Sequence, residues 1–169
     1  MSRGLPLCVV LVPVLLGATM PEPTIKIFNP DTNAVEDVAP VVKSDAEWKQ
    51  SLTPEQYEVM RRKGTERPFS RQCAIPRSGE GVYRCAACQT ALFAYGKKFD
   101  SGTGWPSFWT PISEYNVKEV RDASHGMIRD EVVCARCGSH LGHVFDDGPP
   151  PTGKRYCINA VTLVLAPNH

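Results

Sequence analysis

The sequence lacks an imbalance of charge: 19 basic residues stand against 18 acidic ones, and no run of lysines and arginines is longer than the three at residues 61–63. A protein that binds nucleic acid or an anionic membrane through its overall electrostatic field needs an excess or a stripe of basic side chains. We therefore expect no nucleic-acid partner. Internal repeats and low-complexity tracts are missing as well, and 169 residues suffice for one domain that buries a core without disulfides.

The sequence also lacks an apolar run of the ~20 residues that a membrane-spanning helix needs. Its longest apolar stretch, residues 5–18, follows a single Arg3 and has the length of the hydrophobic region of a secretory signal. Residues 1–20 are interpreted either as a signal peptide or as a non-native extension ahead of a true start at Met20. The first alternative makes the protein exported or periplasmic and the second makes it cytoplasmic, so the compartment stays open.

Proline and glycine are abundant, with 15 and 13 copies, and fall mostly between short apolar runs. Runs rich in β-branched and aromatic residues that are bounded by turn residues are typical of strands. Such runs occupy residues 81–85, 91–95, 126–134, 143–145 and 155–165. We therefore predict a mainly β domain with antiparallel pairing over residues 44–166, preceded by an extended or irregular arm over residues 21–43.

Two short helices are predicted at the start of this domain. Ser44 with Glu47, and Thr53 with Gln56, have the spacing of capping boxes, in which each side chain binds the backbone N–H group of the other residue. Gly64 is expected to end the second helix. The helices should pack on the main body through four large residues, namely Trp48, Leu52, Tyr57 and Met60.

Four of the seven cysteines form two Cys-x-x-Cys pairs, Cys85 with Cys88 and Cys134 with Cys137. Two such pairs brought together offer four thiolates in a tetrahedron, which is the geometry of closed structural Zn²⁺ sites. Two disulfides would use the same residues, but Cys-x-x-Cys disulfide loops are strained unless they serve redox chemistry. A thioredoxin-like motif would need one pair on a βαβ pattern, which is missing here. We therefore favour a structural zinc site.

Cys157 is the candidate nucleophile. On a strand, alternate side chains share a face, so Arg155, Cys157 and Asn159 are expected on one face. An adjacent guanidinium favours the thiolate, which is the reactive form of cysteine. The alternative is that Cys157 is a small buried apolar residue, as most free cysteines are.

Two histidines follow the second cysteine pair closely. His140 and His143 could bind a metal or supply acid–base groups. A second metal site would need a third ligand, and none is obvious, so proton transfer or hydrogen bonding is the favoured interpretation. The alternative is a pair of ordinary structural histidines.

Residues 100–109 form a glycine-rich loop that lacks the Gly-Lys-Ser/Thr of a phosphate-binding loop. Its glycines present Trp105, Phe108 and Trp109, of which one or two must enter the core, while an indole on such a loop can also form the wall of a pocket. Residues 146–153, rich in proline, are suited to line the rim of a cleft.

Taken together, these motifs resemble the type B peptide-methionine (R)-sulfoxide reductase family. The resemblance runs from about residue 43 to residue 165 and rests on long, specific segments in order: the first Cys-x-x-Cys pair, residues 98–108 (KFDSGTGWPSF), the second pair, residues 140–145 (HLGHVF) and residues 155–159 (RYCIN). It implies a compact domain of two antiparallel β-sheets with one structural Zn²⁺. It also implies an oxidoreductase that reduces the R epimer of methionine sulfoxide. We expect the substrate to be chiefly protein-bound, although free methionine sulfoxide stays open as an alternative, and we expect the protein to be a monomer.

The resemblance further implies a role for each candidate residue. Cys157 matches the nucleophile that becomes a sulfenic acid, and His140 and His143 match the histidines that hold and help to protonate the sulfoxide oxygen. Trp105 matches the ring that packs against the terminal methyl group of the substrate. The remaining matches, which orient the site and support the thiolate, are Asp147, Arg155 and Asn159.

The chain departs from many relatives at Thr103, where they carry a second, resolving cysteine. A hydroxyl cannot condense with a sulfenic acid, and some relatives that lack the loop cysteine use a thiol in the neighbourhood of Cys73. We therefore predict a disulfide between Cys73 and Cys157 that thioredoxin reduces; in the alternative, an external thiol reduces the sulfenic acid directly. Cys8 lies within the segment of uncertain status and is given no role.

Two other classes of function compete with this one. A zinc-ribbon binding module would explain the cysteine pairs but would leave Arg155, Cys157 and the histidines without a role. A Cys-His-Asn hydrolase would use Cys157, His143 and Asn159, yet papain-type enzymes place the nucleophile near the mature N-terminus on a different local signature.

Overall fold

The computed structural model describes residues 23–70, 80–123 and 128–166. Two α-helices, α1 (Asp45–Ser51) and α2 (Pro54–Met60), precede the main body. The strands are β1 (Ile25–Asn29), β2 (Ala34–Val38), β3 (Val82–Cys85), β4 (Ala91–Ala94), β5 (Lys98–Phe99), β6 (Ser107–Phe108), β7 (Val117–Asp122), β8 (Arg129–Cys134), β9 (His140–Phe145), β10 (Arg155–Ile158) and β11 (Leu163–Ala166). The predicted mainly β class with short N-terminal helices is confirmed.

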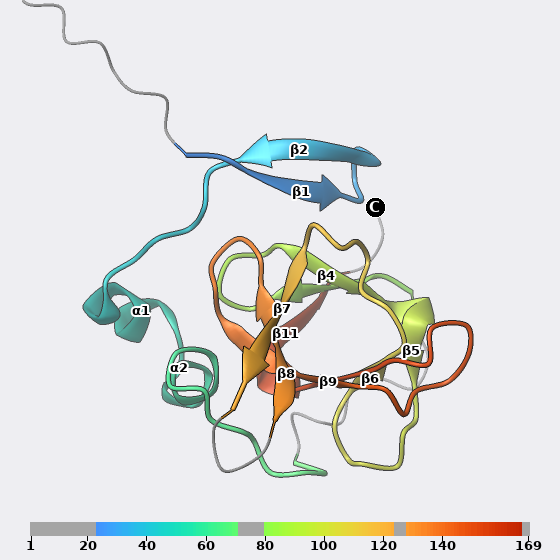
Figure 1. The fold of residues 1–169 in the computed structure, drawn as a ribbon. Coiled ribbons are helices and arrows are strands. Elements are labelled where there is room, and N and C mark those ends of the chain that lie inside the picture. Colours follow the sequence, from blue (N-terminus) through green and yellow to red (C-terminus); the bar gives the residue numbers. More distant parts are fainter. Residues whose placement is uncertain (1–22, 71–79, 124–127, 167–169) are drawn as a thin grey trace, which may run out of the picture.

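The main body consists of two antiparallel sheets, as predicted. The larger has six strands in the order β5-β6-β10-β9-β8-β7, and the smaller has three in the order β11-β3-β4. The strands of both curve around a common interior, while α1 and α2 lie to one side (Figure 1). Long side chains from both sheets fill the space between them.

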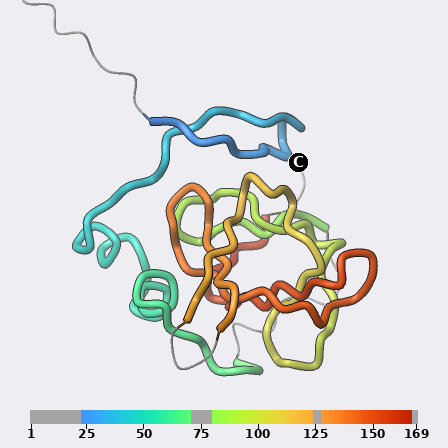
Figure 2. Tube along the Cα trace, viewed as in Figure 1, coloured from blue at the N-terminus to red at the C-terminus, as the bar shows by residue number. Residues whose placement is uncertain are grey.

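A third sheet lies where the sequence predicted an extended or irregular arm. Strands β1 and β2 pair over residues 25–38 and form a hairpin, which sits apart from the helices and is joined to them by an extended segment (Figure 2). The hairpin is held by the buried amide of Asn116, which donates to the Phe28 carbonyl and accepts from the Phe28 N–H, each at 2.8 Å. This partner is 88 residues away in the chain, so local sequence could not reveal it.

Both capping boxes are present. The Ser44 hydroxyl accepts from the Glu47 N–H while the Glu47 carboxylate accepts from the Ser44 N–H, and Thr53 and Gln56 make the same exchange. The end of α2 differs from the prediction. The left-handed position after the helix belongs to Lys63, with a φ of 58°, and the Gly64 N–H donates to the Glu58 carbonyl at 3.0 Å in the manner of a Schellman turn.

The predicted strand over residues 155–165 is broken. A 3₁₀ turn, Ala160–Thr162, separates β10 from β11, and these two strands belong to different sheets. The Glu66 carboxylate holds this turn, because it accepts from the backbone N–H groups of Ala160 and Val161. Strand β7 was not predicted, since four of its six side chains are exposed and its sequence has no apolar alternation.

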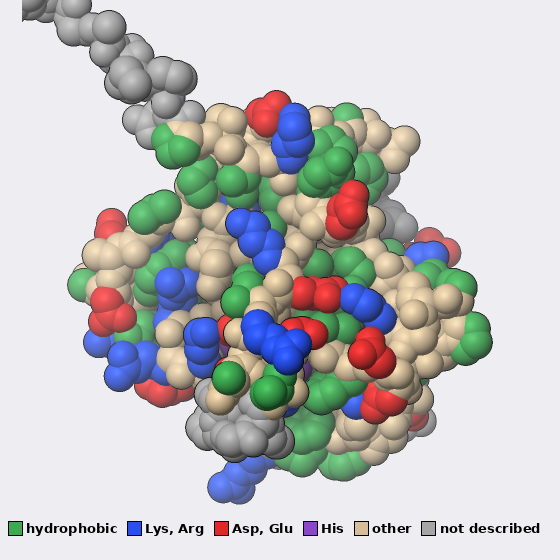
Figure 3. Space-filling view, viewed as in Figure 1, with side chains coloured by type: hydrophobic (Ala, Val, Ile, Leu, Met, Phe, Trp, Pro, Cys, Tyr) green, Lys and Arg blue, Asp and Glu red, His purple; other side chains and the backbone are tan. Residues whose placement is uncertain are grey.

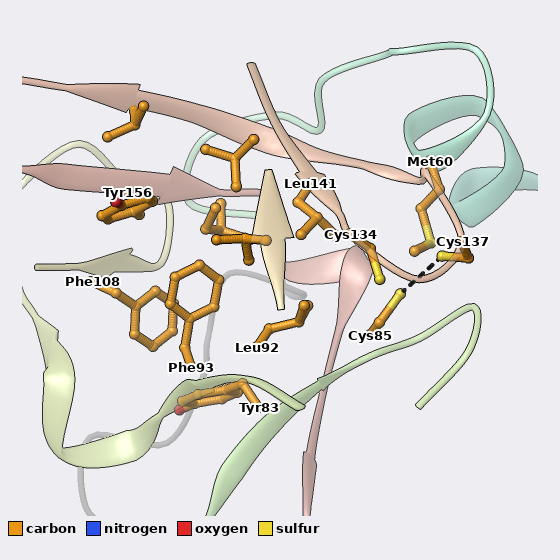
Figure 4. Close-up of a cluster of buried hydrophobic side chains, with 14 of the residues drawn as sticks. Met60, Tyr83, Cys85, Leu92, Phe93, Phe108, Cys134, Cys137, Leu141 and Tyr156 are labelled. Atoms are coloured by element: carbon orange, nitrogen blue, oxygen red, sulfur yellow. Dashed lines mark hydrogen bonds between the residues drawn. The ribbon is translucent and has the colours of Figure 1, made fainter. Parts of the chain in front are cut away.

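The core lies between the two main sheets (Figure 4). Phe93 of β4 stacks on Phe108 of β6 with ring centroids 4.4 Å apart, and the edge of Tyr83 meets Phe108 at 5.2 Å. The four residues predicted to anchor the helices, Trp48, Leu52, Tyr57 and Met60, are all buried in the same cluster. The helices are therefore fixed to the body, and the segment after α2 reaches the sheet that carries Cys157.

In the described part of the chain, no helix combines the length and apolar character needed to cross a membrane. Residues 1–20, the candidate signal or extension, and Cys73 lie outside the described residues. On the face shown in Figure 3, acidic and basic side chains are interspersed, which agrees with the balanced composition.

Candidate functional site

One face of the six-stranded sheet brings the candidate residues together. Cys157 on β10 lies directly opposite His143 on β9 and Ser107 on β6, and His143 in turn lies opposite Glu131 on β8. Directly opposite residues of an antiparallel pair point to the same side, with Cβ atoms about 5 Å apart. Glu131, His143, Cys157 and Ser107 therefore form one row across four strands. The apolar residues next to them on these strands, Phe108, Val132, Val144 and Tyr156, belong to the buried core.

His140 reaches the same face through an irregularity in β9. Two residues that are three apart on a regular strand point to opposite faces. The register between β8 and β9 shifts by one residue at this point: Val132 pairs with Gly142, and Val133 pairs with His140. The extra residue, Leu141, is fully buried in the core. This β-bulge turns His140 to the side of His143, and the two imidazole rings meet edge to face at 5.3 Å.

Gly142 allows the strands to approach closely at the bulge. A Cβ atom at this position would lie 2.0 Å from the Cys157 carbonyl oxygen, so any side chain would force β9 away from β10. The absence of a side chain at Gly142 is therefore what allows β9 and β10 to pair at the bulge.

The Cys157 thiol is half-buried, and opposing effects act on its pKa. Burial raises the pKa and is the largest effect, while the charge of Arg155 and hydrogen bonding from the Thr103 and Arg155 side chains lower it, and Asp147 raises it slightly. The net pKa lies above its ordinary value. Arg155 therefore acts in the predicted direction, but it does not by itself keep the free thiol ionised.

Arg155 is held rigidly in place beside Cys157. Its guanidinium donates two hydrogen bonds to the Asp147 carboxylate, both at 2.8 Å, and lies over the Phe145 ring at 4.5 Å from its centroid. The paired Arg155 holds the pKa of the Asp147 carboxyl below its ordinary value. The loop over residues 146–153, which was expected to line a cleft, thus fixes the cation that lies next to the thiol.

Each histidine is bound by a carboxylate. His140 Nδ1 lies 2.8 Å from Glu131 Oε1, and His143 Nε2 lies 3.0 Å from Asp122 Oδ2. His140 is 3% exposed; burial, the largest effect, lowers its pKa, Glu131 raises it, and the net pKa lies below its ordinary value. The four cysteines of the two Cys-x-x-Cys pairs are the only potential metal cluster in the described ranges, so the histidine pair has no third ligand there.

The glycine-rich loop and the segment after Cys157 are linked through Glu66. The Trp105 indole N–H donates to the Glu66 carbonyl at 3.1 Å, which fixes this half-buried ring. Asn159 is buried; it donates to the Leu141 carbonyl at 3.0 Å and accepts from the Glu66 N–H at 3.1 Å. It lies beyond the end of β10. Its amide joins the backbone of β9, between the two histidines, to the backbone at Glu66.

The four paired cysteines converge at one end of the body. Cys85 Sγ lies 3.8 Å from Cys137 Sγ, Cys88 Sγ lies 3.5 Å from Cys134 Sγ, and all four sulfur atoms lie within 4.8 Å of one another; the side chains of Cys85, Cys134 and Cys137 are drawn in Figure 4. A tetrahedron with Zn–S bonds of about 2.3 Å has edges of about 3.8 Å, whereas a disulfide needs about 2.05 Å. The four residues therefore fit one metal ion rather than two disulfides.

Comparison with known proteins gives the family. The SelR domain matches residues 52–167. The chain belongs to the SelR domain family. Among its relatives, each named peptide methionine sulfoxide reductase MsrB, one from Pseudomonas syringae pv. syringae (strain B728a) is 61% identical over 125 residues, covering 74% of this chain and 95% of the relative. Another from Methanosarcina barkeri is 62% identical over 123 residues, covering 73% and 86%. One from Agrobacterium fabrum is 55% identical over 127 residues, covering 75% and 93%.

The resemblance noted in the sequence is thereby confirmed: this SelR domain is of the type B methionine sulfoxide reductase kind and is an oxidoreductase. The site also contains residues of the SelR domain that sequence reasoning missed, namely Glu66, Asp122 and Glu131. Glu131 carried a local signal, because it is a charged residue inside the apolar end of a predicted strand. Asp122 and Glu66 carried none, since their roles depend on partners from distant elements.

Proposed function

We propose that Cys157 is the nucleophile with which this SelR domain reduces the R epimer of methionine sulfoxide. The supporting observation is the row in which Cys157 faces His143 directly across the β9–β10 pair, with the Arg155–Asp147 ion pair beside the thiol. A nucleophile, a cationic neighbour and two imidazoles on one face are the groups that a thiol-dependent reduction of a sulfoxide requires.

The reaction begins when the Cys157 thiolate attacks the sulfoxide sulfur. The S–O bond of the substrate breaks, the oxygen takes up one proton and passes to Cys157, and the products are the thioether and a cysteine sulfenic acid. The substrate sulfur gains two electrons and the Cys157 sulfur loses two. His140 and His143 hold the oxygen and help to deliver the proton, while Arg155 and Thr103 stabilise the thiolate against the cost of its burial.

Trp105 is the proposed contact for the terminal methyl group of the substrate. Its ring is fixed by the hydrogen bond to Glu66 on a loop whose residue Thr103 interacts with the Cys157 side chain. A fixed ring on one side and two histidines on the other would distinguish the oxygen from the methyl group and thereby select one epimer. Asp147 and Arg155 rim the same site, and Asn159 supports the backbone beneath it.

The geometry also weighs against a Cys-His-Asn hydrolase. In such a triad the asparagine amide orients the histidine ring, whereas here Asn159 binds the Leu141 carbonyl and the Glu66 N–H. The carboxylate of Asp122 takes the position beside His143. A binding module of the zinc-ribbon type would leave this whole constellation without a role.

Recycling is proposed to pass through Cys73. The preceding segment is anchored at the site, since the Phe69 N–H donates to the Gly104 carbonyl at 3.0 Å, next to Thr103. Cys73 follows Phe69 by four residue steps, which reach up to about 14 Å in an extended chain, and we propose that this reach brings its thiol to Cys157. The Cys157–Cys73 disulfide would then be reduced by thioredoxin or a similar dithiol.

A Cys73→Ser variant separates this route from direct reduction by an external thiol. After one equivalent of sulfoxide, mass spectrometry should find an intramolecular Cys73–Cys157 disulfide in the parent protein and a Cys157 sulfenic acid in the variant. A Cys8→Ser protein is the matched control. The same yield of intramolecular disulfide in the Cys73→Ser variant would remove Cys73 from the mechanism.

Zn²⁺ is the metal that we propose for the four-cysteine site. Four thiolates in a closed tetrahedron favour zinc over the harder divalent cations. All four positions are taken by protein ligands, so a metal there would stabilise the fold and take no part in the reduction. Cys85 and Cys88 would hold it from the β3 side, and Cys134 and Cys137 from the β8 side.

The activity is tested by incubating the protein with dithiothreitol and both epimers of methionine sulfoxide, free and within a peptide. The R epimer alone should disappear, and the peptide should be the better substrate, as the names of the relatives suggest. Consumption of the S epimer, or hydrolysis of the peptide, would contradict the proposal. Elution as a single chain in size-exclusion chromatography is the expectation for the oligomeric state.

A further inference from the structure

Each histidine of the site lies at the end of a chain of charges. The Glu131 carboxylate that binds His140 also accepts from Lys63 at 2.8 Å, and the Asp122 carboxylate that binds His143 also pairs with Arg129 at 3.2 Å. The two chains engage opposite ring nitrogens, Nδ1 of His140 and Nε2 of His143. The fold thus provides a separate orienting group for each ring.

The His140 chain fixes one tautomer. Lys63 and His140 hold the pKa of Glu131 below its ordinary value despite burial, so Glu131 is a carboxylate at neutral pH and can only accept hydrogen bonds. His140 Nδ1 must therefore carry the proton. Its other nitrogen, Nε2, is buried and has no hydrogen-bond partner among the residues that the structure describes. A buried polar atom without a partner destabilises the fold, and such atoms call for a functional explanation.

We propose that Glu131 is a positioning residue for the reduction: it binds the Nδ1–H of His140, so that Nε2 can take up a proton and donate it to the sulfoxide oxygen, directly or through a water molecule. The inference rests on the function proposed above. Within the described ranges, the Glu131 side chain hydrogen-bonds to Lys63 and His140. Its effect on the reaction is therefore exerted through the imidazole.

Lys63 completes the arrangement from outside the sheet. Its backbone takes the left-handed conformation at the end of α2, and its side chain, 68% exposed, extends to a carboxylate that is 3% exposed. The solvated end of Lys63 keeps the buried charge of Glu131 compensated whether or not His140 is protonated. A proton can then be gained or lost at Nε2 without a change at Glu131.

The wild-type protein allows a direct test that needs no activity measurement. The ¹⁵N chemical shifts of the His140 ring, recorded on the zinc-loaded protein at a pH above its titration, should show a protonated Nδ1 and an unprotonated Nε2. The opposite tautomer would overturn the proposal. A failure of the sulfoxide reductase assay would leave this result unaffected, so the two claims can fail separately.

Substitution of Glu131 gives the kinetic test. In Glu131→Gln the amide can donate to Nδ1 as well as accept from it, so the two tautomers should mix, and kcat should fall on the order of 10- to 100-fold with little change in KM. Glu131→Asp, which keeps the charge, should recover part of the loss. Glu119→Gln is the matched control, because Glu119 also pairs with a lysine, Lys154, but touches neither histidine.

The pH profile distinguishes positioning from a structural role. Three titratable or charged groups lie around His140: Glu131 from β8, His143 from its own strand, and Lys63 from the segment after α2. Further groups lie beyond His143, namely Asp122, Arg129 and, on β10, Cys157. Glu131 raises the pKa of His140 against the effect of burial. Because Nε2 must be protonated to deliver its proton, loss of Glu131 should move the alkaline limb of the kcat profile to lower pH. An unmoved limb, or a kcat equal to that of Glu119→Gln in a folded, zinc-loaded variant, would overturn the proposal.

Discussion

At the scale of single residues, Cys157 differs from the other cysteines in the described ranges. Four of these five thiols belong to the metal cluster, and the fifth faces a histidine across a strand pair. Its reactivity depends on a balance: burial favours the neutral thiol, and Arg155 and Thr103 favour the thiolate.

Replacement of Arg155 should therefore raise the pKa of the Cys157 thiol further. Arg155→Met removes both the charge and the hydrogen bond that lower this pKa, so thiolate formation, and the rate of alkylation by iodoacetamide, should shift to higher pH. Peptide-resolved mass spectrometry across a pH series measures the midpoint. Arg84→Met, which breaks a comparable ion pair with Asp31 on the three-stranded sheet, should leave the midpoint unchanged. A lower midpoint in Arg155→Met would refute the assignment.

Residue identities were predictable where the motif is local, and partners were not. Cys157 and the two histidines stand out in the sequence because polar residues interrupt apolar strands. The bulge that brings the histidines to one face depends on the register between β8 and β9, which a single strand does not reveal. Asp122 and Glu131 became functional candidates only once that register was known.

At the scale of elements, the helices were the most predictable parts, because a capping box is complete within four residues. The broken strand over residues 155–165 was not predictable. Its central 3₁₀ turn exists because the Glu66 carboxylate binds the N–H groups of Ala160 and Val161. Glu66 lies about 95 residues earlier in the chain. The residues have a continuous β propensity, but these hydrogen bonds from a distant side chain override it.

The second capping box should contribute measurable stability. Thr53→Ala removes the hydroxyl that accepts from the Gln56 N–H at 3.2 Å, and the free energy of unfolding should fall by about 1 kcal/mol. Urea denaturation measures the change. Thr53→Ser keeps the hydroxyl, so its free energy of unfolding should differ from that of the wild type by only a few tenths of about 1 kcal/mol. Equal destabilisation by both substitutions would show that the methyl group of Thr53, and not the cap, matters.

At the scale of the whole molecule, the cysteine cluster joins the two main sheets. Cys85 ends β3 of the smaller sheet and Cys134 ends β8 of the larger, so a metal bound there clamps them together. The two turns are built alike: the Gln89 N–H donates to the Cys85 carbonyl and the Gly138 N–H to the Cys134 carbonyl, each at 2.8 Å. The paired spacing made this clamp predictable, whereas the β1–β2 hairpin, held through Asn116, was not.

Removal of the metal should destabilise the entire fold. Without it, buried thiols at the junction of the sheets lose their ligand, and a loss of about 4 kcal/mol would lower the melting temperature by about 10 °C for a chain of this size. Scanning calorimetry before and after chelation, with zinc content from atomic absorption, measures the effect. Cys88→Ser should reproduce it in part. Unchanged melting after complete loss of zinc would contradict a structural role.

The most direct test of the account is the turnover of the R epimer by a Cys157→Ser variant. The hydroxyl matches the thiol in shape but cannot take oxygen from a sulfoxide, so the rate should fall at least about 1000-fold, while zinc content and melting temperature remain those of the wild type. Persistent reduction of the R epimer by this folded, zinc-loaded variant would contradict the assignment of Cys157 and with it the proposed site.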